Sequence, residues 1–414
     1  MVKVPEIPLK QHNRMLAKAT WKMGPNVFSD LMLPTEIRRG RSIKKAEDAI
    51  PIGMRPETRR ETDDLGNERV YITGYDEKPV FADFSQGHLF LIVAPPGAGK
   101  TVLLKGMVGE LENNGYYLCC LADMKNDFYE CLKPAQESLA RLLPYWRRPR
   151  ALPVTALVPL YIPHNNPSIR IPDDVQRFQL SIEDMKAEDI IYALKLDERS
   201  PAQMTLLKNV WSENDPPKSV KALAERVRDA NATKLFTSLG IEIEGKMGEY
   251  ANATKSSLIR EIGRLANEKF FGEETTVDVV DLIERGRFVD DCLFETRGMM
   301  DYHNAYSYAI MRKIYEAKVA HGRLGMGSRL VLLAPDVGAT MMPNRKNTAI
   351  KDYLINQVIT IGRHKGIYVV ADTQNLSQLP EEALLQVQSW VVFARTTGND
   401  LERIAKSTKK KYSE

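Results

Sequence analysis

The sequence has few cysteines and no long apolar segment. Its four cysteines form no CxxC pair and have no histidine at metal-ligand spacing, which argues against a disulfide scaffold and a zinc site; they are Cys119, Cys120, Cys131 and Cys292. The longest apolar runs, at 88–96 and 330–335, are far shorter than the roughly 20 residues that span a bilayer. No apolar stretch follows the charged residues 1–15, so no secretory signal is predicted. We therefore expect a cytoplasmic protein without a transmembrane segment of its own.

The sequence also lacks an excess of charge of one sign. Fifty-eight basic and fifty-four acidic residues leave a net charge of +4, so bulk charge does not indicate a nucleic-acid-binding protein and any contact with a polyanion must be local. The composition, with 43% hydrophobic and 27% charged residues, is that of a soluble globular protein. A chain of 414 residues has room for two or three domains at roughly 100–200 residues each.

The sequence contains two local basic clusters, and the second is a candidate for a contact with DNA phosphates. Residues 38–45 form the basic segment RRGRSIKK. In residues 145–150, three arginines follow Tyr145 and Trp146, a composition suited to phosphate contacts and base stacking; the arginines are Arg147, Arg148 and Arg150. The same composition also suits a solvated connector whose long side chains cover apolar surface, and both interpretations stay open.

Continuous apolar runs predict a parallel sheet. A strand buried on both faces is apolar throughout rather than alternating, and five segments have this pattern: 88–94, 116–123, 329–336, 367–374 and 390–395. Helical patterns lie between them, such as the apolar face of Tyr306, Ile310, Ile314 and Ala317. Strands that alternate with helices indicate an α/β fold.

The order of these segments predicts three parts. Residues 1–80 form a small, partly β amino-terminal element with the basic cluster, and residues 81–164 and 285–414 form the α/β core. Residues 165–284 form an inserted, mainly helical subdomain, in which Leu258, Ile262 and Leu265 share one apolar face. Seven prolines between 144 and 172 predict connecting or edge structure before it.

One segment has the spacing of a Walker A phosphate-binding loop. It comprises Ala94, where the first glycine usually stands, and then Pro95, Pro96, Gly97, Ala98, Gly99, Lys100 and Thr101. Small residues let backbone N–H groups surround phosphate oxygens at a helix amino terminus, the lysine reaches the β- and γ-phosphates, and the hydroxyl binds Mg²⁺. The preceding buried strand and following helix favour this interpretation over a chance match. The cofactors expected are ATP and Mg²⁺.

A carboxylate at the end of a neighbouring strand is the second requirement for Mg²⁺ binding. Asp336 follows the apolar run 329–335 and fits this role together with Thr101, although an aspartate at this place can also serve only to cap a strand. In most P-loop hydrolases a glutamate comes next and polarises the attacking water, but here the next residue is Val337. We therefore expect an ATPase whose hydrolysis is slow unless another group activates the water.

These motifs together resemble the FtsK–HerA superfamily of ring-forming P-loop motors, which includes HerA, TraG-type coupling proteins and type IV secretion ATPases. The resemblance extends over roughly residues 50–407. Besides the P-loop, it is carried by IPIG at 50–53, by LADMKNDF at 121–128, where Asp123 and Lys125 match a D-P-K-G-E motif, and by 355–380, which is similar to a family signature that contains a TQ pair. The resemblance implies a RecA-like P-loop NTPase core.

The resemblance also implies roles for single residues. Gln374 would sense the γ-phosphate from the strand next to the P-loop strand, and Arg363 would be an arginine finger that reaches a neighbouring subunit, with Arg395 as a rival. Asp372, two residues before Gln374 and so on the same strand face, is a candidate to orient the water in place of the missing glutamate.

Three functions remain open at this point. The first is an ATP-driven, ring-forming DNA translocase, a hexamer that moves DNA through its pore and works with a membrane-bound transfer or secretion partner. The second is a nucleotide-binding assembly ATPase of a secretion, pilus or defence complex, with slow hydrolysis or none. The third, a small-molecule P-loop kinase, fits poorly with the long helical insertion and with Gln374.

Overall fold

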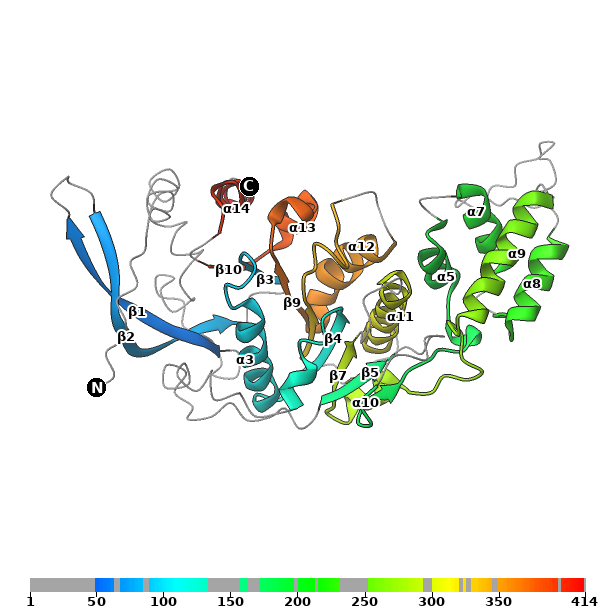
Figure 1. The fold of residues 1–414 in the computed structure, drawn as a ribbon, viewed down its shortest axis with the longest axis horizontal. Coiled ribbons are helices and arrows are strands. Elements are labelled where there is room, and N and C mark those ends of the chain that lie inside the picture. The colour runs from blue at the N-terminus through cyan, green and yellow to red at the C-terminus, as the bar shows by residue number, and fades with distance from the viewer. Residues whose placement is uncertain are drawn as a thin grey trace.

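The computed structural model describes most of the chain from Ala49 onward. The described residues are 49–62, 68–84, 89–132, 157–161, 171–196, 200–212, 215–230, 252–292, 300–319, 323–324, 329–344, 349–393 and 396–412. Strands β1 (Ala49–Thr62) and β2 (Glu68–Asp83) pair antiparallel in a long hairpin. The hairpin begins within residues 1–80, predicted to be partly β, ends three residues beyond them, and projects from one end of the molecule (Figure 1).

The central sheet is entirely parallel across the described residues. Its eight strands there have the order β10-β3-β9-β8-β4-β7-β5-β6. Five of them, β3, β4, β8, β9 and β10, are the apolar runs that the sequence predicts as strands. The strand bounds are Leu89–Val93 (β3), Tyr117–Asp123 (β4), Leu157–Tyr161 (β5), Gln176–Arg177 (β6), Phe288–Cys292 (β7), Leu330–Ala334 (β8), Ile367–Thr373 (β9) and Ser389–Val392 (β10).

Helix α3 (Lys100–Asn113) covers one face of this sheet. Its Leu104, Met107 and Leu111 recur at helical spacing and pack in one buried cluster with Ile92 and Leu333 from the strands. Burial of each such side chain stabilises the fold by about 1.5–3 kcal/mol. The helix is thereby fixed over the strands whose ends carry the candidate site.

Other helices cover the opposite face (Figure 1). The alternate strand residues Leu91, Leu332 and Val369 pack there with Ile310 and Ile314 of α11. The predicted apolar face of α11 is confirmed, because all four of its residues are buried. The elements that contribute to this cluster include α10 (Val279–Glu284), α11 (Met300–Val319), the π-helix η6 (Leu354–Ile361) and α13 (Glu381–Gln386).

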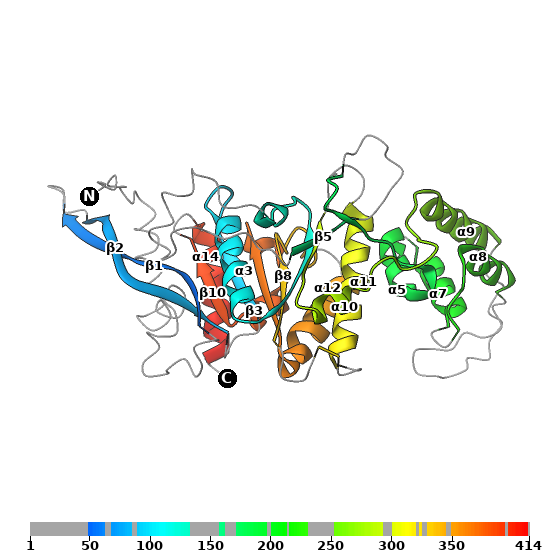
Figure 2. The same cartoon turned by 90° about the horizontal axis from the view of Figure 1, so that it is seen from below.

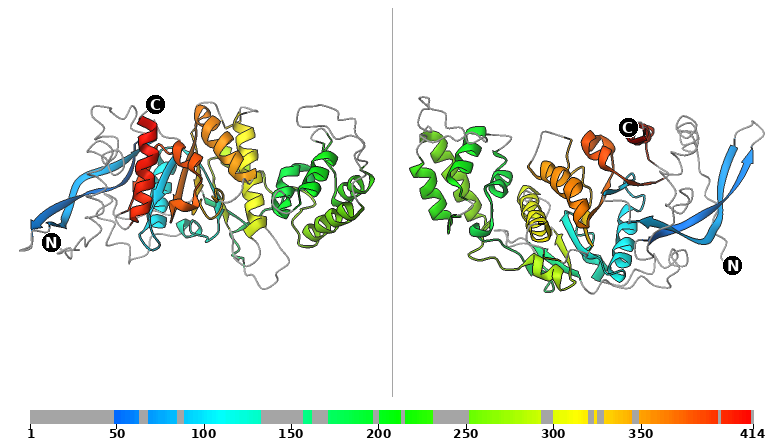
Figure 3. Two further views of the ribbon diagram at one scale, coloured as in Figure 1. Left: turned by 90° about the horizontal axis from the view of Figure 1, so that it is seen from above. Right: turned by 180° about the vertical axis from the view of Figure 1, so that it is seen from behind.

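Shorter elements complete the core. Helix α12 (Ala349–Tyr353) leads directly into η6, and α14 (Gly398–Tyr412) packs on α13 near the β10 edge of the sheet (Figure 3). The 3₁₀ turns are η3 (Tyr129–Leu132), η5 (Ile182–Asp184), η7 (Gly362–Lys365) and η8 (Leu376–Gln378). No helix in the described ranges has the length and apolar character to cross a membrane.

The helical part of the insertion lies at the end of the molecule opposite the hairpin (Figures 1 and 2). It comprises α5 (Ala187–Leu194), α7 (Pro201–Val210), α8 (Val220–Asp229) and α9 (Asn252–Asn267). The predicted face of α9 is fully buried, and α8 and α9 pack against each other. Helix α5 packs on α11 and so joins this group to the core.

Three strands of the sheet, β5, β6 and β7, lie where the sequence patterns do not predict them. Strand β7 contains Asp290 and Asp291, which interrupt its apolar run, yet both are fully buried. Asp291 accepts hydrogen bonds from Ser307 and from the backbone N–H of Ala122, and its Oδ1 lies 2.7 Å from His303 Nε2. Strand β5, from the proline-rich segment, pairs with β7 inside the sheet. In β7, the hydrogen-bond partners of Asp291 thus explain how a charged side chain is buried in a strand that lacks a continuous apolar run.

Candidate functional site

The P-loop follows β3 and leads into α3. Ala94 is fully buried and donates its N–H to the Thr373 carbonyl oxygen at 3.3 Å, so a small side chain suits the place where a glycine is usual. Gly97 and Gly99 have φ angles of 72° and 101°, a left-handed region that favours glycine. The remaining loop residues form a turn in which the Ala98 N–H donates to the Pro95 carbonyl oxygen, with Pro96 exposed.

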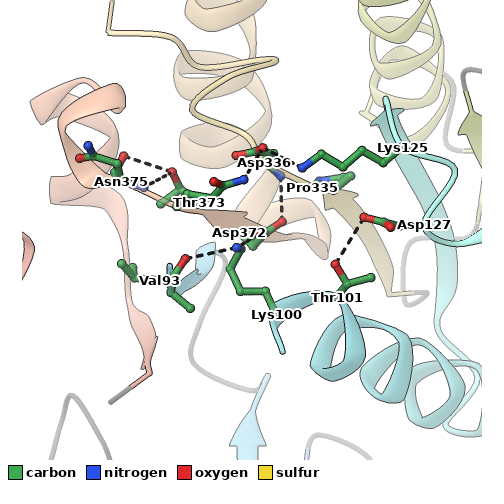
Figure 4. Close-up of polar contacts among 12 residues, drawn as sticks. Val93, Lys100, Thr101, Lys125, Asp127, Pro335, Asp336, Asp372, Thr373 and Asn375 are labelled. Atoms are coloured by element: carbon green, nitrogen blue, oxygen red, sulfur yellow. Dashed lines mark hydrogen bonds and ion pairs between the residues drawn. The ribbon is translucent and has the colours of Figure 1, made fainter. Parts of the chain in front are cut away.

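Lys100, the first residue of α3, lies beside β9. Its Nζ donates to the Ala94 carbonyl oxygen at 3.2 Å and lies 3.7 Å from Oδ2 of Asp372 (Figure 4). Only 10% of its side chain is exposed. The lysine is therefore held within the loop that it is predicted to serve, close to where phosphates bind in this motif.

Asp336 and Gln374 converge from two adjacent strands. Asp336 follows β8 by two residues with a φ of 48°, and Gln374 directly follows β9. The Gln374 Nε2 donates to Asp336 Oδ2 at 3.0 Å. Because β3, β9 and β8 are neighbours in the sheet, the P-loop and these two side chains meet at one carboxyl edge, as the sequence predicts.

Asp372 of β9 contacts the backbone of Asp336 and the side chain of Lys100 and so holds both in place. Its Oδ1 accepts the backbone N–H of Asp336 at 2.8 Å, and its carbonyl oxygen accepts the N–H of Val337 at 2.8 Å. Burial raises the pKa of Asp372 to about 6, although the Asp336 N–H and the Lys100 ammonium both lower it. Both carboxylate oxygens therefore face groups of the protein, a geometry that favours positioning over contact with a water.

Val337 does not point into the site. Its side chain is fully buried in the apolar cluster on the α11 face of the sheet. A glutamate at this position would have to lie among apolar side chains unless the turn after β8 rearranged. The position that usually carries the water-activating carboxylate is thus part of the core.

The loop after a third strand, β4, carries two further residues, whose contacts with the site cannot be read from the sequence. In the loop after β4, Lys125 Nζ donates to Asp336 Oδ2 at 3.1 Å. In the same loop, Asp127 Oδ2 accepts a hydrogen bond from Thr101 Oγ1 at 3.4 Å (Figure 4). The sequence feature that could have indicated Asp127 is the segment DMKND at 123–127, in which Asp127 stands at the position of the glutamate of the D-P-K-G-E motif.

The donor set of this edge fits Mg²⁺. The hydroxyl of Thr101 and the carboxylates of Asp336 and Asp127 are the hard oxygen ligands that this ion prefers. Among the described residues, no three histidine, cysteine or acidic side chains gather as a metal site. The protein would therefore supply one or two ligands, with phosphate and water oxygens completing the shell, the usual pattern for Mg²⁺.

Several predicted residues cannot be placed. Arg363 lies in η7, but its side chain is outside the described residues. Arg395, the basic segment 38–45 and the segment 145–150 also lie outside them. The predicted arginine finger and DNA contacts therefore remain predictions.

Comparisons with known proteins address the fold. Neither the protein-family models nor the sequences of characterised proteins give a match. Among solved structures, VirB4 of Thermoanaerobacter pseudethanolicus is similar with a TM-score of 0.52 and 13% identity, over 89% of this chain and 90% of VirB4. The chain has the P-loop NTPase fold of VirB4.

Two further solved structures are similar at lower scores. The bacterial conjugative coupling protein TrwB matches with a TM-score of 0.42 and 15% identity, over 77% of this chain and 68% of TrwB. TrwB in complex with a non-hydrolysable GTP analogue matches with a TM-score of 0.41 and 16% identity, over the same shares of the two chains. The similarity to VirB4 confirms the α/β P-loop NTPase fold that the sequence predicts.

Proposed function

We propose that this chain is an ATP-driven motor that assembles as a ring, in the form of a hexamer, and moves DNA during its transfer. The ATP chemistry rests on one observation, the convergence of Lys100, Asp336 and Gln374 at the ends of three adjacent strands. The DNA part is supported by the sequence at 355–380, which is similar to a signature of the FtsK–HerA motors.

In this proposal the P-loop binds the phosphates. Backbone N–H groups of the loop and the amino terminus of α3 would face the phosphate oxygens, and Lys100 would neutralise their charge. Thr101 and Asp336, with Asp127 nearby, would hold the Mg²⁺, which supplies charge neutralisation at the β- and γ-phosphates when bound. Asp372 would keep Lys100 and the Asp336 backbone in place.

The attacking water would be oriented by Gln374. Its amide lies at the end of β9, 3.0 Å from Asp336 Oδ2, and an amide side chain can orient a water for in-line attack. Because Val337 is in the core and Asp372 is engaged, no carboxylate among the described residues takes the usual water-activating place. We therefore expect slow basal turnover, which binding of DNA or of a neighbouring subunit would raise.

A second function has one specific observation in its favour. A nucleotide-binding assembly ATPase would use ATP mainly to stabilise subunit contacts within a larger complex, and the absence of a carboxylate at position 337 suits slow hydrolysis. In either case a membrane-bound transfer or secretion partner is expected.

ATP hydrolysis with and without DNA separates these two functions. The native protein and Lys100→Ala would be assayed with Mg²⁺ alone, with single-stranded DNA and with duplex DNA, and particles would be imaged under the same conditions. A motor should form rings and show DNA-stimulated hydrolysis that Lys100→Ala lacks. Rings whose slow hydrolysis is indifferent to DNA would favour the assembly ATPase.

A further inference from the structure

Lys125 makes a contact that the proposed ATPase mechanism does not use. Its ammonium donates to Asp336 Oδ2, the same oxygen that accepts the Gln374 amide, and its Nζ lies 3.1 Å away (Figure 4). Asp336 is the carboxylate expected to face Mg²⁺. A protein cation therefore already pairs with the carboxylate that is expected to face the divalent cation.

The backbone around Lys125 is held by hydrogen bonds to a buried side chain. The buried carboxylate of Asp123 accepts the N–H groups of Lys125, Asp127 and Phe128 at 3.3, 3.1 and 3.0 Å. Phe128 is itself fully buried, in the cluster under α3. The loop after β4 is thus a rigid support, and a change of partner at Lys125 would involve the side chain alone.

The side chain of Lys125 is free to change partners. It is 56% exposed, whereas Asp336 is 20% exposed. Exposed ion pairs are weak, since water and salt screen them, so a divalent cation can displace the ammonium. Lys125 also lies within electrostatic reach of Asp127 and Asp372, so its removal would leave three carboxylates balanced mainly by Lys100.

We propose that the Lys125 ammonium and the divalent cation are alternative partners of Asp336, so that Lys125 stabilises the metal-free site and must leave when the metal enters. This inference rests on the proposed function of the site. It makes two predictions of opposite sign for a variant without the charge. Nucleotide should bind less well without metal, because more negative charge faces the phosphates, and the metal should bind more readily, because it has no competitor.

Binding of a fluorescent ATP analogue tests this directly, in the full chain and without reference to turnover. Lys125→Met would be compared with the native protein and Lys125→Arg, first in EDTA and then in a Mg²⁺ titration at fixed analogue. The matched control is Lys105→Met, since Lys105 of α3 pairs with Glu130 at 2.6 Å outside the proposed site. Thermal unfolding of each variant would accompany the titrations.

For Lys125→Met we expect affinity in EDTA to fall about three- to tenfold and the half-saturating Mg²⁺ concentration to fall by a similar factor. Lys125→Arg and Lys105→Met should remain near native. If Lys125→Met lost the same affinity for the analogue with and without Mg²⁺, Lys125 would simply be a phosphate ligand and the proposed exchange would be wrong. Unchanged affinity and an unchanged half-saturating Mg²⁺ concentration would also contradict the exchange. A native protein that binds no analogue in either condition would instead contradict the proposed function.

Discussion

Asp372 is a carboxylate whose surroundings oppose its charge. Its pKa is raised from 3.8 to about 6 by burial. Folding therefore favours the protonated form, so the native protein loses stability as the pH rises from about 4 through about 6. Above that range the loss is complete and constant.

Replacement of Asp372 by asparagine should remove this pH dependence while retaining an oxygen that accepts the Asp336 N–H. The unfolding free energy of Asp372→Asn, relative to native, should improve by ~2 kcal/mol between pH 4 and pH 7.5. Urea unfolding at the two pH values measures this. A difference between the two proteins that does not change with pH would mean that the Asp372 carboxylate titrates normally.

Val337 belongs to the core, and its replacement should act on stability. Val337→Glu would bury a carboxylate among apolar side chains, which should cost ~3–5 kcal/mol and should not accelerate hydrolysis. Val337→Thr, of the same shape, is the control and should cost less. Thermal unfolding and ATPase rates check both variants. A stable Val337→Glu protein with faster turnover would show that the turn after β8 can present this side chain to the nucleotide.

The sequence motifs predicted that the P-loop, Asp336 and Gln374 lie at the ends of neighbouring strands, because short motifs encode strand ends and loop geometry, and the structure places them there. They did not predict the contact of Lys125 with Asp336, whose partners are 211 residues apart. Asp372 was also proposed as a water-orienting group from its strand face alone. Only the three-dimensional contacts show both of its oxygens facing protein groups.

Helices α5 and α11 are joined by a buried ion pair. Arg312 of α11 donates to Asp189 Oδ2 of α5 at 2.7 Å, and their side chains are 5% and 1% exposed. Burial raises the pKa of Asp189, against the opposing attraction of Arg312. The same carboxylate accepts the Lys186 N–H at the start of α5. This pair therefore connects the helical part of the insertion to the core.

Arg312→Met should destabilise the protein by ~3–5 kcal/mol, because it leaves the Asp189 carboxylate buried without its cation. The double variant Arg312→Met with Asp189→Leu should recover most of this loss. Lys221→Met, which removes an exposed pair with Glu225, is the control and should change stability by less than ~0.5 kcal/mol. Denaturant unfolding measures all three. Near-native stability of Arg312→Met alone would show that this pair does not hold α5 on α11.

Strands with a continuous apolar sequence could be predicted, whereas strands interrupted by aspartate or proline could not. Strands β3, β4, β8 and β9 are continuous apolar runs and were predicted from the sequence. Strand β7 was not, because its two aspartates break the pattern, and only the partners of Asp291 on α11 and β4 account for its burial. Strand β5 was not predicted either, because Pro159 lies within it and a proline in a sequence argues against a strand inside a sheet.

The whole molecule is elongated, with the hairpin at one end, the α7–α9 group at the other and the candidate site in the core between them (Figures 1, 2 and 3). If rings form, an arginine of one subunit can reach the nucleotide of the next. Arg363→Ala and Lys100→Ala should then each be inactive alone. Mixed rings should recover part of the hydrolysis, at interfaces that pair an intact P-loop with an intact Arg363.

This recovery would be measured as ATP hydrolysis after the two variants are mixed and reassembled. Lys100→Ala mixed with the double variant Lys100→Ala, Arg363→Ala is the control, because no interface in it has an intact P-loop. Mixed rings that form but stay inactive would exclude a role of Arg363 in the neighbouring site.

The central claim is that one site, built from the P-loop and the ends of β8 and β9, binds and hydrolyses ATP. Single-turnover ATP hydrolysis with Mg²⁺ by the native protein, Lys100→Ala and Asp336→Asn tests it most directly. We predict measurable hydrolysis by the native protein and a loss of at least about a hundredfold in each variant, with folding unchanged. Native-like hydrolysis in either variant would contradict the assignment of the site.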